Sequence, residues 1–411
     1  MRVPVLAYAL LFAAAPSPLV SQSLSTWVGS WAASQQIPES QNALAPDDLR
    51  DATLREVIHL SAGGHSLRVR LSNAFGVAPL QLSSVHVARP VSNASAAIDV
   101  VTDRPVTFHG SPDVIVPAGA EFLSDPLEYS VAAGSDLAIS IHFDNPPEQQ
   151  TGHPGSRATS YLAHGNLVSA GDLPNAKKVE HWYQLSGVDI TAGGAAASIV
   201  VLGDSITDGH GATTNGNDRW PDVLARRLQA DPALRNSGVL NEGIGGNHLL
   251  TDGLGPSALA RFDRDVLAQT GVRSLIVLEG VNDLGGLARI QEVSAGEHAA
   301  LAQRVIAAYE QMIARSHGHG IRIVGCTILP YVGSGYYHPG PASEADRESV
   351  NAWIRTPGHF DAVIDFDLVT RDPDHPDRLR PAFDSGDHLH PSPAGYAAMA
   401  NAVPLSVITP Q

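Results

Sequence analysis

Four clusters of polar residues in the second half of the chain have the composition that acyl-transfer chemistry requires. Ser205 lies in "SIVVLGDSITDGHG", directly after an apolar run, and "NEGIGGN", "EGVND" and "DSGDHLHPS" follow in that order. Acyl transfer to a serine needs an activated hydroxyl, an oriented base and hydrogen-bond donors for the oxyanion. Asp387 and His390, three residues apart, can orient and supply the base if their stretch is turn-like or helical. Asn282 offers a side-chain amide donor.

The surrounding segments would bring these clusters to one edge of a sheet. From about residue 196, apolar strands alternate with helical segments such as "RWPDVLARRLQAD", in which Trp220, Leu224 and Leu228 form a core-facing stripe. Ser392 is placed to cap the last helix. This alternation predicts a parallel sheet covered by helices on both faces, with the working groups at the carboxyl ends of its strands. Ser205 would then lie near a helix N-terminus, where its amide stabilises negative charge.

Residues 25–195 follow a different pattern, with short apolar–polar runs broken by Gly, Pro and Asn. Many short strands at regular spacing predict an all-β sandwich or jelly-roll-like domain before the α/β part. The stretch "LREVIHLSAGGHSLRVRLSN" predicts a hairpin with a Gly-Gly turn. We expect Trp27, Trp31 and Trp182 in the sandwich core rather than on an exposed carbohydrate platform.

Taken together, "GDSIT", "NEGIGGN", "GVND" and "DHLHP" resemble the signature blocks of the SGNH (GDSL-type) hydrolase superfamily over about residues 197–405. The resemblance implies a flavodoxin-like α/β/α sandwich as the catalytic domain, over residues 196–408. It also implies Ser205 as nucleophile, His390 as base and Asp387 as the group that orients the base. The implied oxyanion donors are the Ser205 amide, the Asn282 side chain and the amide of Gly246, which stands five residues after Asn241; Gly245 is the rival for that amide.

Two departures accompany the resemblance. Position 207 is threonine, so Ser205 does not lie in the Gly-x-Ser-x-Gly elbow of α/β-hydrolases. His388 stands where the family most often has a small residue, and it could contact substrate or compete with His390 as the base; Pro391 after His390 favours His390.

Two further segments have open interpretations. In "YVGSGYYHPG", Tyr331, Tyr336 and Tyr337 could form a stacking wall for a sugar or aryl group, or the loop could fold on its own aromatics. The acidic segment 365–377 could hold a cation, but it lacks recognisable ligand spacing. A solvated acidic loop is therefore the favoured interpretation.

Composition limits the partners of the protein. The 411 residues include 26 basic and 42 acidic side chains, a net charge of −16, which disfavours nucleic acid and anionic membranes. Residues 1–22 resemble a signal peptide, with Arg2 before a short apolar run, so we expect a secreted or periplasmic protein without stable membrane insertion. The single cysteine, Cys326, excludes an internal disulfide and lies in a predicted buried strand.

The sequence thus predicts a secreted carboxylester hydrolase that needs no metal or organic cofactor. By analogy with carbohydrate esterases that carry a β-sandwich, its substrates would be acetylated glycosides or polysaccharides. The alternatives are a broad short-chain or aryl esterase or lipase, and a catalytically inactive carbohydrate-binding protein. The oligomeric state is not predicted.

Overall fold

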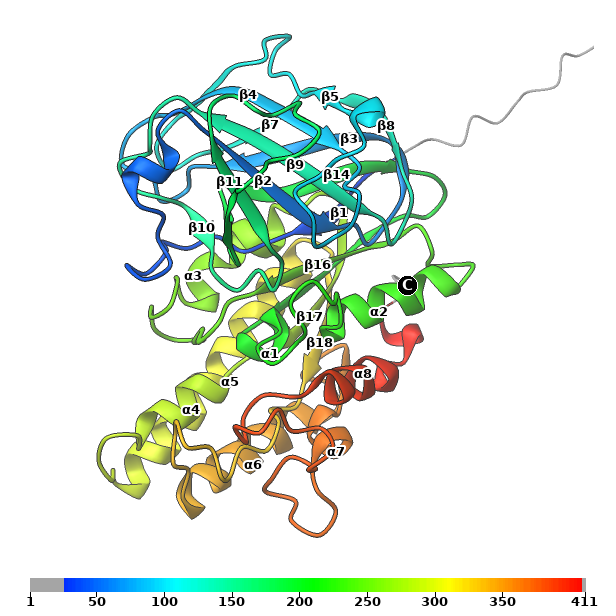
Figure 1. Ribbon diagram of the computed structural model, residues 1–411. Helices are drawn as coiled ribbons and strands as arrows, with labels where there is room; N and C mark the ends of the chain where they lie inside the picture. Colours follow the sequence, from blue (N-terminus) through cyan, green and yellow to red (C-terminus); the bar gives the residue numbers. More distant parts are fainter. Residues whose placement is uncertain (1–25, 409–411) are drawn as a thin grey trace, which may run out of the picture.

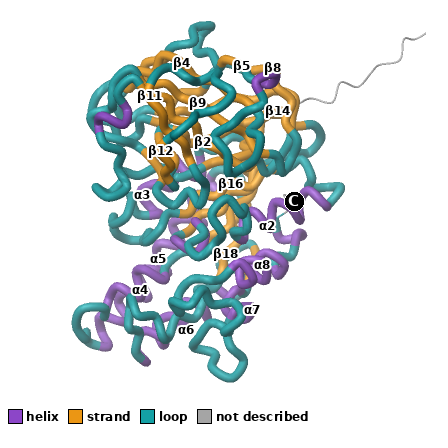
Figure 2. The backbone as a smooth tube through the Cα atoms, viewed as in Figure 1, coloured by secondary structure: helices purple, strands orange, loops and turns teal. Residues whose placement is uncertain are grey.

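The chain forms antiparallel β-sheets in its N-terminal part and a parallel β-sheet in its C-terminal part, as the computed structural model in Figure 1 shows. The structure describes residues 26–408, so the predicted signal peptide, residues 1–22, lies outside the described residues. Strand pairing is antiparallel as far as Ala192 and parallel from Ser198 onward. Figure 2 shows the corresponding change from a strand-rich part to a part in which helices surround the strands.

The N-terminal part contains two large antiparallel sheets. The five-stranded sheet consists of β1 (Thr26–Ala32), β14 (Leu185–Ala192), β3 (Gly64–Ser72) and β7 (Glu121–Leu123), with β8 (Leu127–Val131) also on β3. The seven-stranded sheet consists of β12 (Lys177–Val179), β11 (Ser160–His164), β2 (Ala52–His59), β9 (Asp136–Phe143), β4 (Leu80–Ala88) and β5 (Arg104–Pro105), with β6 (Val114–Val116) on β4. Strands β10 (Gly152–His153) and β13 (Trp182–Tyr183) form a separate pair, and two short 3-10 helices cover Pro46–Leu49 and Val100–Thr102.

One hydrophobic core lies between the two large sheets. Leu67 and Val69 of β3 meet Ile139 and Ile141 of β9 in this core, and all four are fully buried. Apolar side chains from both sheets are thereby removed from water, which is the packing of a β-sandwich. Trp31 and Trp182 lie in the same core with their rings edge to face at 4.9 Å.

The predicted hairpin around the Gly-Gly dipeptide is wrong. Both strands form, but β2 pairs with β9 and β11, whereas β3 pairs with β14, β7 and β8 in the other sheet. The connection crosses from one sheet to the other. A Cβ at Gly63 would lie 2.6 Å from the Ala133 nitrogen, so the glycine is required by close backbone packing rather than by a hairpin turn.

The C-terminal part is a five-stranded parallel sheet in the order β16-β15-β17-β18-β19. Its strands are β15 (Ser198–Gly203), β16 (Gly238–Gly243), β17 (Val272–Leu278), β18 (Arg322–Cys326) and β19 (Ala362–Ile364). This is the flavodoxin-like order, in which ligands bind at the carboxyl ends of the strands beside the point where strand order reverses. The predicted parallel sheet with flanking helices is confirmed.

Helices flank this sheet on either side in Figure 1. One group contains α2 (Trp220–Ala230), α7 (Phe366–Thr370) and α8 (Pro393–Ala402), and the other contains α3 (Ala258–Phe262), α4 (Val281–Leu287), α5 (Ala295–Gly318) and α6 (Pro341–Arg355). The short α1 (Ser205–Asp208) follows β15, a π-helical turn (Asp263–Leu267) follows α3, and a 3-10 turn (Leu405–Val407) follows α8. No helix in the described part of the chain is long and apolar enough to cross a membrane.

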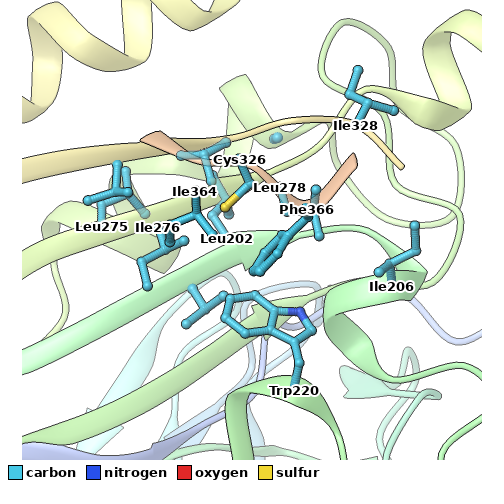
Figure 3. Packing of buried hydrophobic residues seen from close by; sticks show 14 of the residues in the cluster. Leu202, Ile206, Trp220, Leu275, Ile276, Leu278, Cys326, Ile328, Ile364 and Phe366 are labelled. Carbon is cyan, nitrogen blue, oxygen red and sulfur yellow. The ribbon is translucent and has the colours of Figure 1, made fainter. Parts of the chain in front are cut away.

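The core of the parallel sheet confirms the stripe predicted for α2. Trp220, Leu224 and Leu228 are fully buried, and the Trp220 ring meets Phe366 at 5.4 Å (Figure 3). Cys326 is buried in β18 among apolar side chains (Figure 3). Burial raises the pKa of its thiol well above the ordinary value, so the thiol remains protonated and unreactive.

The two parts of the chain share a tightly packed junction. Ala33, directly after β1, forms a parallel bridge with Asn241 of β16. A Cβ at Gly29 would lie 2.8 Å from Leu240 Cδ1, so β1 passes close over β16. The N-terminal part therefore lies against the strand whose carboxyl end carries "NEGIGGN".

Candidate active site

Ser205, His390 and Asp387 form a continuous chain of hydrogen bonds. Ser205 Oγ lies 2.8 Å from His390 Nε2, and His390 Nδ1 lies 2.6 Å from Asp387 Oδ2. An ionised carboxylate only accepts, so His390 carries its proton on Nδ1 and Nε2 accepts the Ser205 hydroxyl proton. Ser205 is 7% and His390 8% exposed. This is the nucleophile–base–carboxylate arrangement that acyl transfer requires.

Helix α1 presents Ser205 at the carboxyl end of β15. Asp204 caps the helix, with its side chain accepting the Ile206 amide at 2.9 Å. Ser205 is the first helical residue, and the first amides of a helix have no partner within it. Gly243, at the end of β16, packs so closely on α1 that a Cβ there would collide with the Asp208 nitrogen. The ends of β15 and β16 and the start of α1 thus meet at one point.

A short turn before α8 positions the base. Asp387 Oδ1 accepts the amides of Leu389 at 3.0 Å and His390 at 2.9 Å, while Oδ2 binds the imidazole. Ser392 caps α8 by accepting the Gly395 amide at 3.3 Å, as predicted. Partial burial alone would raise the pKa of Asp387, but these hydrogen bonds and the adjacent imidazole hold it well below its ordinary value. The carboxylate therefore stays charged at any pH at which the imidazole acts as a base.

Asn282 is fixed by bonds at both ends of its amide. It lies in α4 directly after β17; its Nδ2 donates to the Asn247 carbonyl at 2.5 Å and its Oδ1 accepts the Tyr337 hydroxyl at 2.5 Å. An amide nitrogen carries two hydrogens, so one remains for an oxyanion. Gly246 directly precedes Asn247 and has a φ of +69°, a left-handed conformation that favours glycine. Gly245 lies beside it, near Asp208.

Buried acidic groups surround the start of α1. Burial raises the pKa of Asp204 to about 7 against the opposing effect of the Ile206 amide. Burial also raises the pKa of Asp283, which accepts the amides of Leu249 at 2.8 Å and Leu250 at 3.1 Å. The raised pKa values favour the neutral carboxyl forms, which lessens negative charge beside Ser205, where an oxyanion must form.

The three tyrosines of the loop 331–340 occupy different environments. Tyr336 is 54% exposed and stacks under Arg289 at 3.8 Å, whereas Tyr337 is buried on Asn282. Tyr331 is 1% exposed and lies in the hydrophobic core. This corrects the expectation of a three-tyrosine wall, because a ring enclosed by core side chains cannot stack on a substrate.

His388 is turned away from the Ser205–His390 hydrogen bond. Its Nδ1 lies 2.5 Å from Asp384 Oδ2, and its side chain is 56% exposed beside Gly333. This placement leaves His390 as the imidazole that contacts Ser205 and puts His388 on the outer rim.

Two carboxylates of the acidic segment 365–377 form ion pairs. Asp365 lies 2.7 Å from Arg355, and Asp367 lies 2.9 Å from Arg347. The two arginines balance the negative charge of these carboxylates, the role that a bound cation would have had. The ion pairs also hold α7 against α6.

His210 was not singled out in the sequence, yet it lies against the base. Its ring centroid is 4.1 Å from that of His390, and its Nε2 is 3.9 Å from Asp387 Oδ2. Burial, His390 and Arg157 together lower the pKa of His210 to about 4. The only signal in the sequence is its place five residues after Ser205.

Among the described residues, His210, Asp387 and His390 are the one group whose ligand atoms lie close enough to hold a metal ion, within 4.8 Å of one another. Both nitrogens of His390 are already bonded, to Ser205 and Asp387. His210 Nδ1 faces the Arg157 guanidinium at 3.4 Å. A donor set with occupied nitrogens beside a cation does not fit a metal site.

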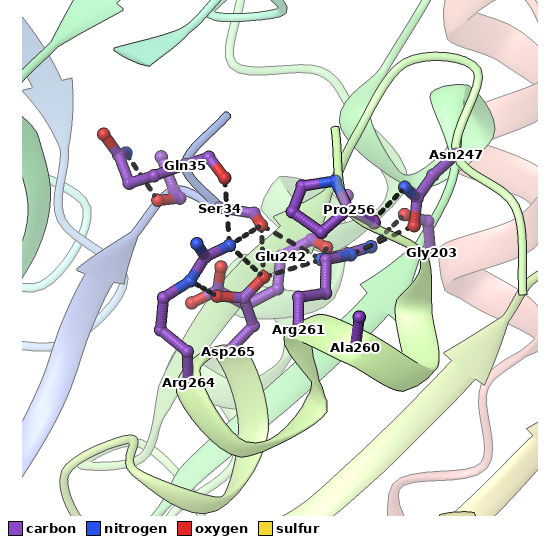
Figure 4. A network of polar contacts seen from close by, with 12 residues as sticks. Ser34, Gln35, Gly203, Glu242, Asn247, Pro256, Ala260, Arg261, Arg264 and Asp265 are labelled. Atoms are coloured by element: carbon purple, nitrogen blue, oxygen red, sulfur yellow. Dashed lines mark hydrogen bonds and ion pairs between the residues drawn. The ribbon is translucent and has the colours of Figure 1, made fainter. Parts of the chain in front are cut away.

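Arg261 is a second residue that sequence reasoning missed, and it organises the junction beneath the site (Figure 4). Its guanidinium donates to the carbonyls of Gly203 at 3.0 Å and Glu242 at 2.6 Å, near the ends of β15 and β16. It also donates to Asn247 Oδ1 at 3.0 Å and pairs with Asp265 at 3.0 Å. One buried arginine therefore links both strand ends to the residue that holds Asn282.

The strand order and the Ser–His–Asp geometry together define a serine-hydrolase domain of α/β architecture. Residues 201–398 match the model of the GDSL-like Lipase/Acylhydrolase family. This part of the chain is a GDSL/SGNH hydrolase domain, preceded by antiparallel β-sheets, and the family consists of carboxylic ester hydrolases. No curated protein matches the chain.

Several solved structures are similar to this part of the chain. A G-D-S-L family protein from Desulfitobacterium hafniense DCB-2 has 25% identity and a TM-score of 0.36, covering 50% of this chain and 97% of its own. A variant of an acetyl xylan esterase from Geobacillus stearothermophilus has 22% identity and a TM-score of 0.36, covering 50% and 92%. A GDSL-like lipase from Bacteroides thetaiotaomicron VPI-5482 has 16% identity and a TM-score of 0.37, covering 51% and 87%.

Proposed function

We propose that the protein is an exported esterase that removes acetyl groups from glycosides or polysaccharides through an acyl-Ser205 intermediate. The observation that carries the proposal is the hydrogen-bonded chain from Ser205 Oγ through His390 to Asp387. The family match supports an acylhydrolase, while the acetyl group, the sugar and export are part of the proposal.

The proposed reaction has two steps. Ser205 Oγ attacks the ester carbonyl carbon while His390 Nε2 takes the hydroxyl proton, and the carbonyl oxygen becomes an oxyanion. The Ser205 amide, the Gly246 amide and Asn282 Nδ2 would donate to that oxyanion. Collapse breaks the bond to the alcohol oxygen, which takes the proton from His390. A water then attacks acyl-Ser205, His390 accepts its proton and returns it to Ser205, and the carboxylic acid leaves.

The surroundings of Ser205 favour a small acyl group on a polar alcohol. His210, with its side chain 50% exposed, lies against the base, and His388, at 56%, lies on the outer rim, bonded to Asp384. Polar side chains of this kind suit hydroxyl-rich sugars rather than lipid tails. Leu254, 46% exposed beside Gly246, offers an apolar side chain near a proposed oxyanion donor, where an acetyl methyl group could be placed.

The test is acetate release from acetylated glycans, measured beside hydrolysis of p-nitrophenyl esters of increasing chain length. We expect acetyl substrates to be preferred, and S205A to lose activity by several orders of magnitude. S40A, which alters an exposed serine bonded only to Gln41, serves as the matched control. Preference for long acyl chains would overturn the acetyl assignment, and undiminished hydrolysis by S205A would overturn the mechanism.

A further inference from the structure

The N-terminal β-sandwich places one positively charged side chain, that of Arg157, at the rim of the hydrolase site. Arg157 follows β10, and its Nη2 lies 3.4 Å from Nδ1 of His210. The His210 ring in turn lies 4.1 Å from the ring of His390. The guanidinium is therefore separated from the catalytic base by a single imidazole.

The backbone around Arg157 is held in place by both parts of the chain. Arg157 has a φ of +49°, a left-handed conformation that costs free energy for a residue other than glycine. Its carbonyl accepts the Asn215 amide at 2.8 Å, and Asn215 Oδ1 accepts the Thr159 amide at 2.8 Å. The carbonyl of the preceding Ser156 accepts a hydrogen bond from Arg219. These hydrogen bonds fix the position of the Arg157 backbone, from which the side chain extends.

The Arg157 guanidinium has no ion-pair partner within the described chain, although the protein is strongly acidic. Its Nε is buried and makes no hydrogen bond within that part of the chain. The neighbouring Asp208, whose pKa Arg157 helps to lower, is hydrogen-bonded to His153 at 2.9 Å. Because Nε is enclosed, an anionic ligand would meet the guanidinium at its Nη nitrogens, beside His210.

The side of the site on which Arg157 lies identifies the part of the substrate it would meet. His390 must deliver its proton to the departing alcohol oxygen, so the alcohol lies on the His390 side. The oxyanion donors Asn282 and Gly246 lie on segments that follow β17 and β16 instead. Arg157, beyond His210, faces the alcohol.

We infer that Arg157 is a specificity residue that binds a carboxylate on the alcohol portion of the ester, so that acetylated uronic-acid glycosides are preferred over their neutral counterparts. The inference rests on the proposed deacetylation. A guanidinium presents paired N–H donors that match a carboxylate and form charge-assisted hydrogen bonds. Within the protein, the guanidinium contacts the side chain of His210. This imidazole is neutral, so it does not compete with the guanidinium for an anionic ligand.

The experiment compares two acetylated substrates that differ only in charge. These are the acetylated methyl galacturonoside and the acetylated methyl galactoside, in which a hydroxymethyl group replaces the carboxylate. We expect kcat/KM of the natural protein to favour the uronoside by about tenfold or more, the range for a charge-assisted hydrogen bond. R157Q should bring the ratio close to one. R104Q, which removes an exposed arginine bonded to the carbonyls of Val101 and Asp103, should keep the preference.

Three results would overturn the inference. If the natural protein hydrolysed the uronoside and the galactoside with similar kcat/KM, a preference for anionic substrates would be rejected. If R157Q lowered kcat/KM by the same factor for both substrates, Arg157 would act only through His210. Preference for a p-nitrophenyl succinate monoester over the butyrate, without preference for the uronoside, would place the anion on the acyl side. In each case Ser205-dependent acetate release would leave the proposed function intact, whereas its failure on every ester would reject both.

Discussion

His153 and Asp208 form a buried ion pair across the junction between the β-sandwich and the hydrolase domain. His153 Nε2 lies 2.9 Å from Asp208 Oδ1, and both side chains are almost completely buried. His153 Nδ1 lies 2.8 Å from the Ser34 carbonyl, which can only accept. Burial raises the pKa of Asp208, but His153, Arg157 and Arg219 together lower that pKa overall. The imidazole of the sandwich thus connects the Ser34 carbonyl to the helix that begins with Ser205.

Replacing His153 with alanine should therefore destabilise the protein strongly. The change leaves the Asp208 carboxylate buried without its counter-charge, which costs about 3–5 kcal/mol in comparable buried pairs. Urea unfolding of H153A measures this loss. H164A removes an exposed histidine bonded to the Arg50 carbonyl and should change the free energy of unfolding by less than about 0.5 kcal/mol. A loss below about 1 kcal/mol in H153A would contradict the ion pair.

Tyr337 should act on turnover through the orientation of Asn282. Y337F removes the donor to Asn282 Oδ1 and frees the amide to rotate about its remaining bond to Asn247. We expect kcat to fall about tenfold with little change in KM, because an oxyanion donor acts mainly in the transition state. Y129F removes a buried hydroxyl in strand β8 of the sandwich and should retain full kcat. A rise in KM at constant kcat in Y337F would instead place Tyr337 in substrate binding.

Arg261 should be essential for the stability of the junction. R261M leaves the Gly203 and Glu242 carbonyls without the Arg261 donor and removes one of the two arginines on Asp265, which keeps its ion pair with Arg264. We expect a loss of at least about 2 kcal/mol in the free energy of unfolding, because each buried acceptor left without a donor costs about 1–3 kcal/mol. R273M, at an exposed position in β17, is the control. Similar unfolding midpoints for the two variants would show that the network does not stabilise the fold.

Asp204 should make stability depend on pH in a direction opposite to that of most carboxylates. Its folded-state pKa of about 7 lies above its ordinary value of 3.8, so ionisation at rising pH costs the folded state more than the unfolded state. Stability attributable to Asp204 is fully present below about pH 4 and is lost as the pH rises toward 7. Each unit of pKa difference corresponds to about 1.4 kcal/mol.

The variant D204N isolates this effect, because asparagine caps helices as well as aspartate does. Relative to the natural protein, D204N should gain stability steadily between pH 4 and pH 7, measured by urea unfolding at each pH. D99N, at an exposed 3-10 cap whose side chain accepts the Val101 amide, should show no such gain. A constant difference between D204N and the natural protein across this range would refute a raised pKa.

The candidate catalytic residues could be predicted from sequence by two different signals. Ser205 and Asn282 each follow a parallel strand, and the carboxyl ends of those strands meet at one edge of the sheet. His390 lies in the turn before α8 and was predicted from its short spacing to Asp387. Helix α4 is not among the helical segments expected from the sequence, and it contains the poor helix formers Gly285 and Gly286. A Cβ at Gly285 would lie 2.5 Å from the Tyr337 ring, so this glycine is required by packing rather than by a turn.

The contacts that support the site could not be predicted in the same way. Arg157, His153 and Arg261 act across the junction between two parts of the chain, and no local spacing relates them to Ser205. The Gly-Gly connection after β2 shows the same limit, because a hairpin and a crossing between sheets use the same residues. Local pattern specifies strands and helices, whereas sheet partnership depends on which faces become buried together.

The bridge between Ala33 and Asn241 joins residues that are far apart in the order of synthesis, so activity can be used to follow folding of the chain. Residues near position 33 are synthesised long before residue 241, and His390 follows later still. A chain synthesised only as far as residue 240 therefore lacks both Asn241, which forms the bridge, and His390. Ester hydrolysis during refolding can thus report the moment at which the last segments assemble, with a sensitivity that measurements of secondary structure do not provide.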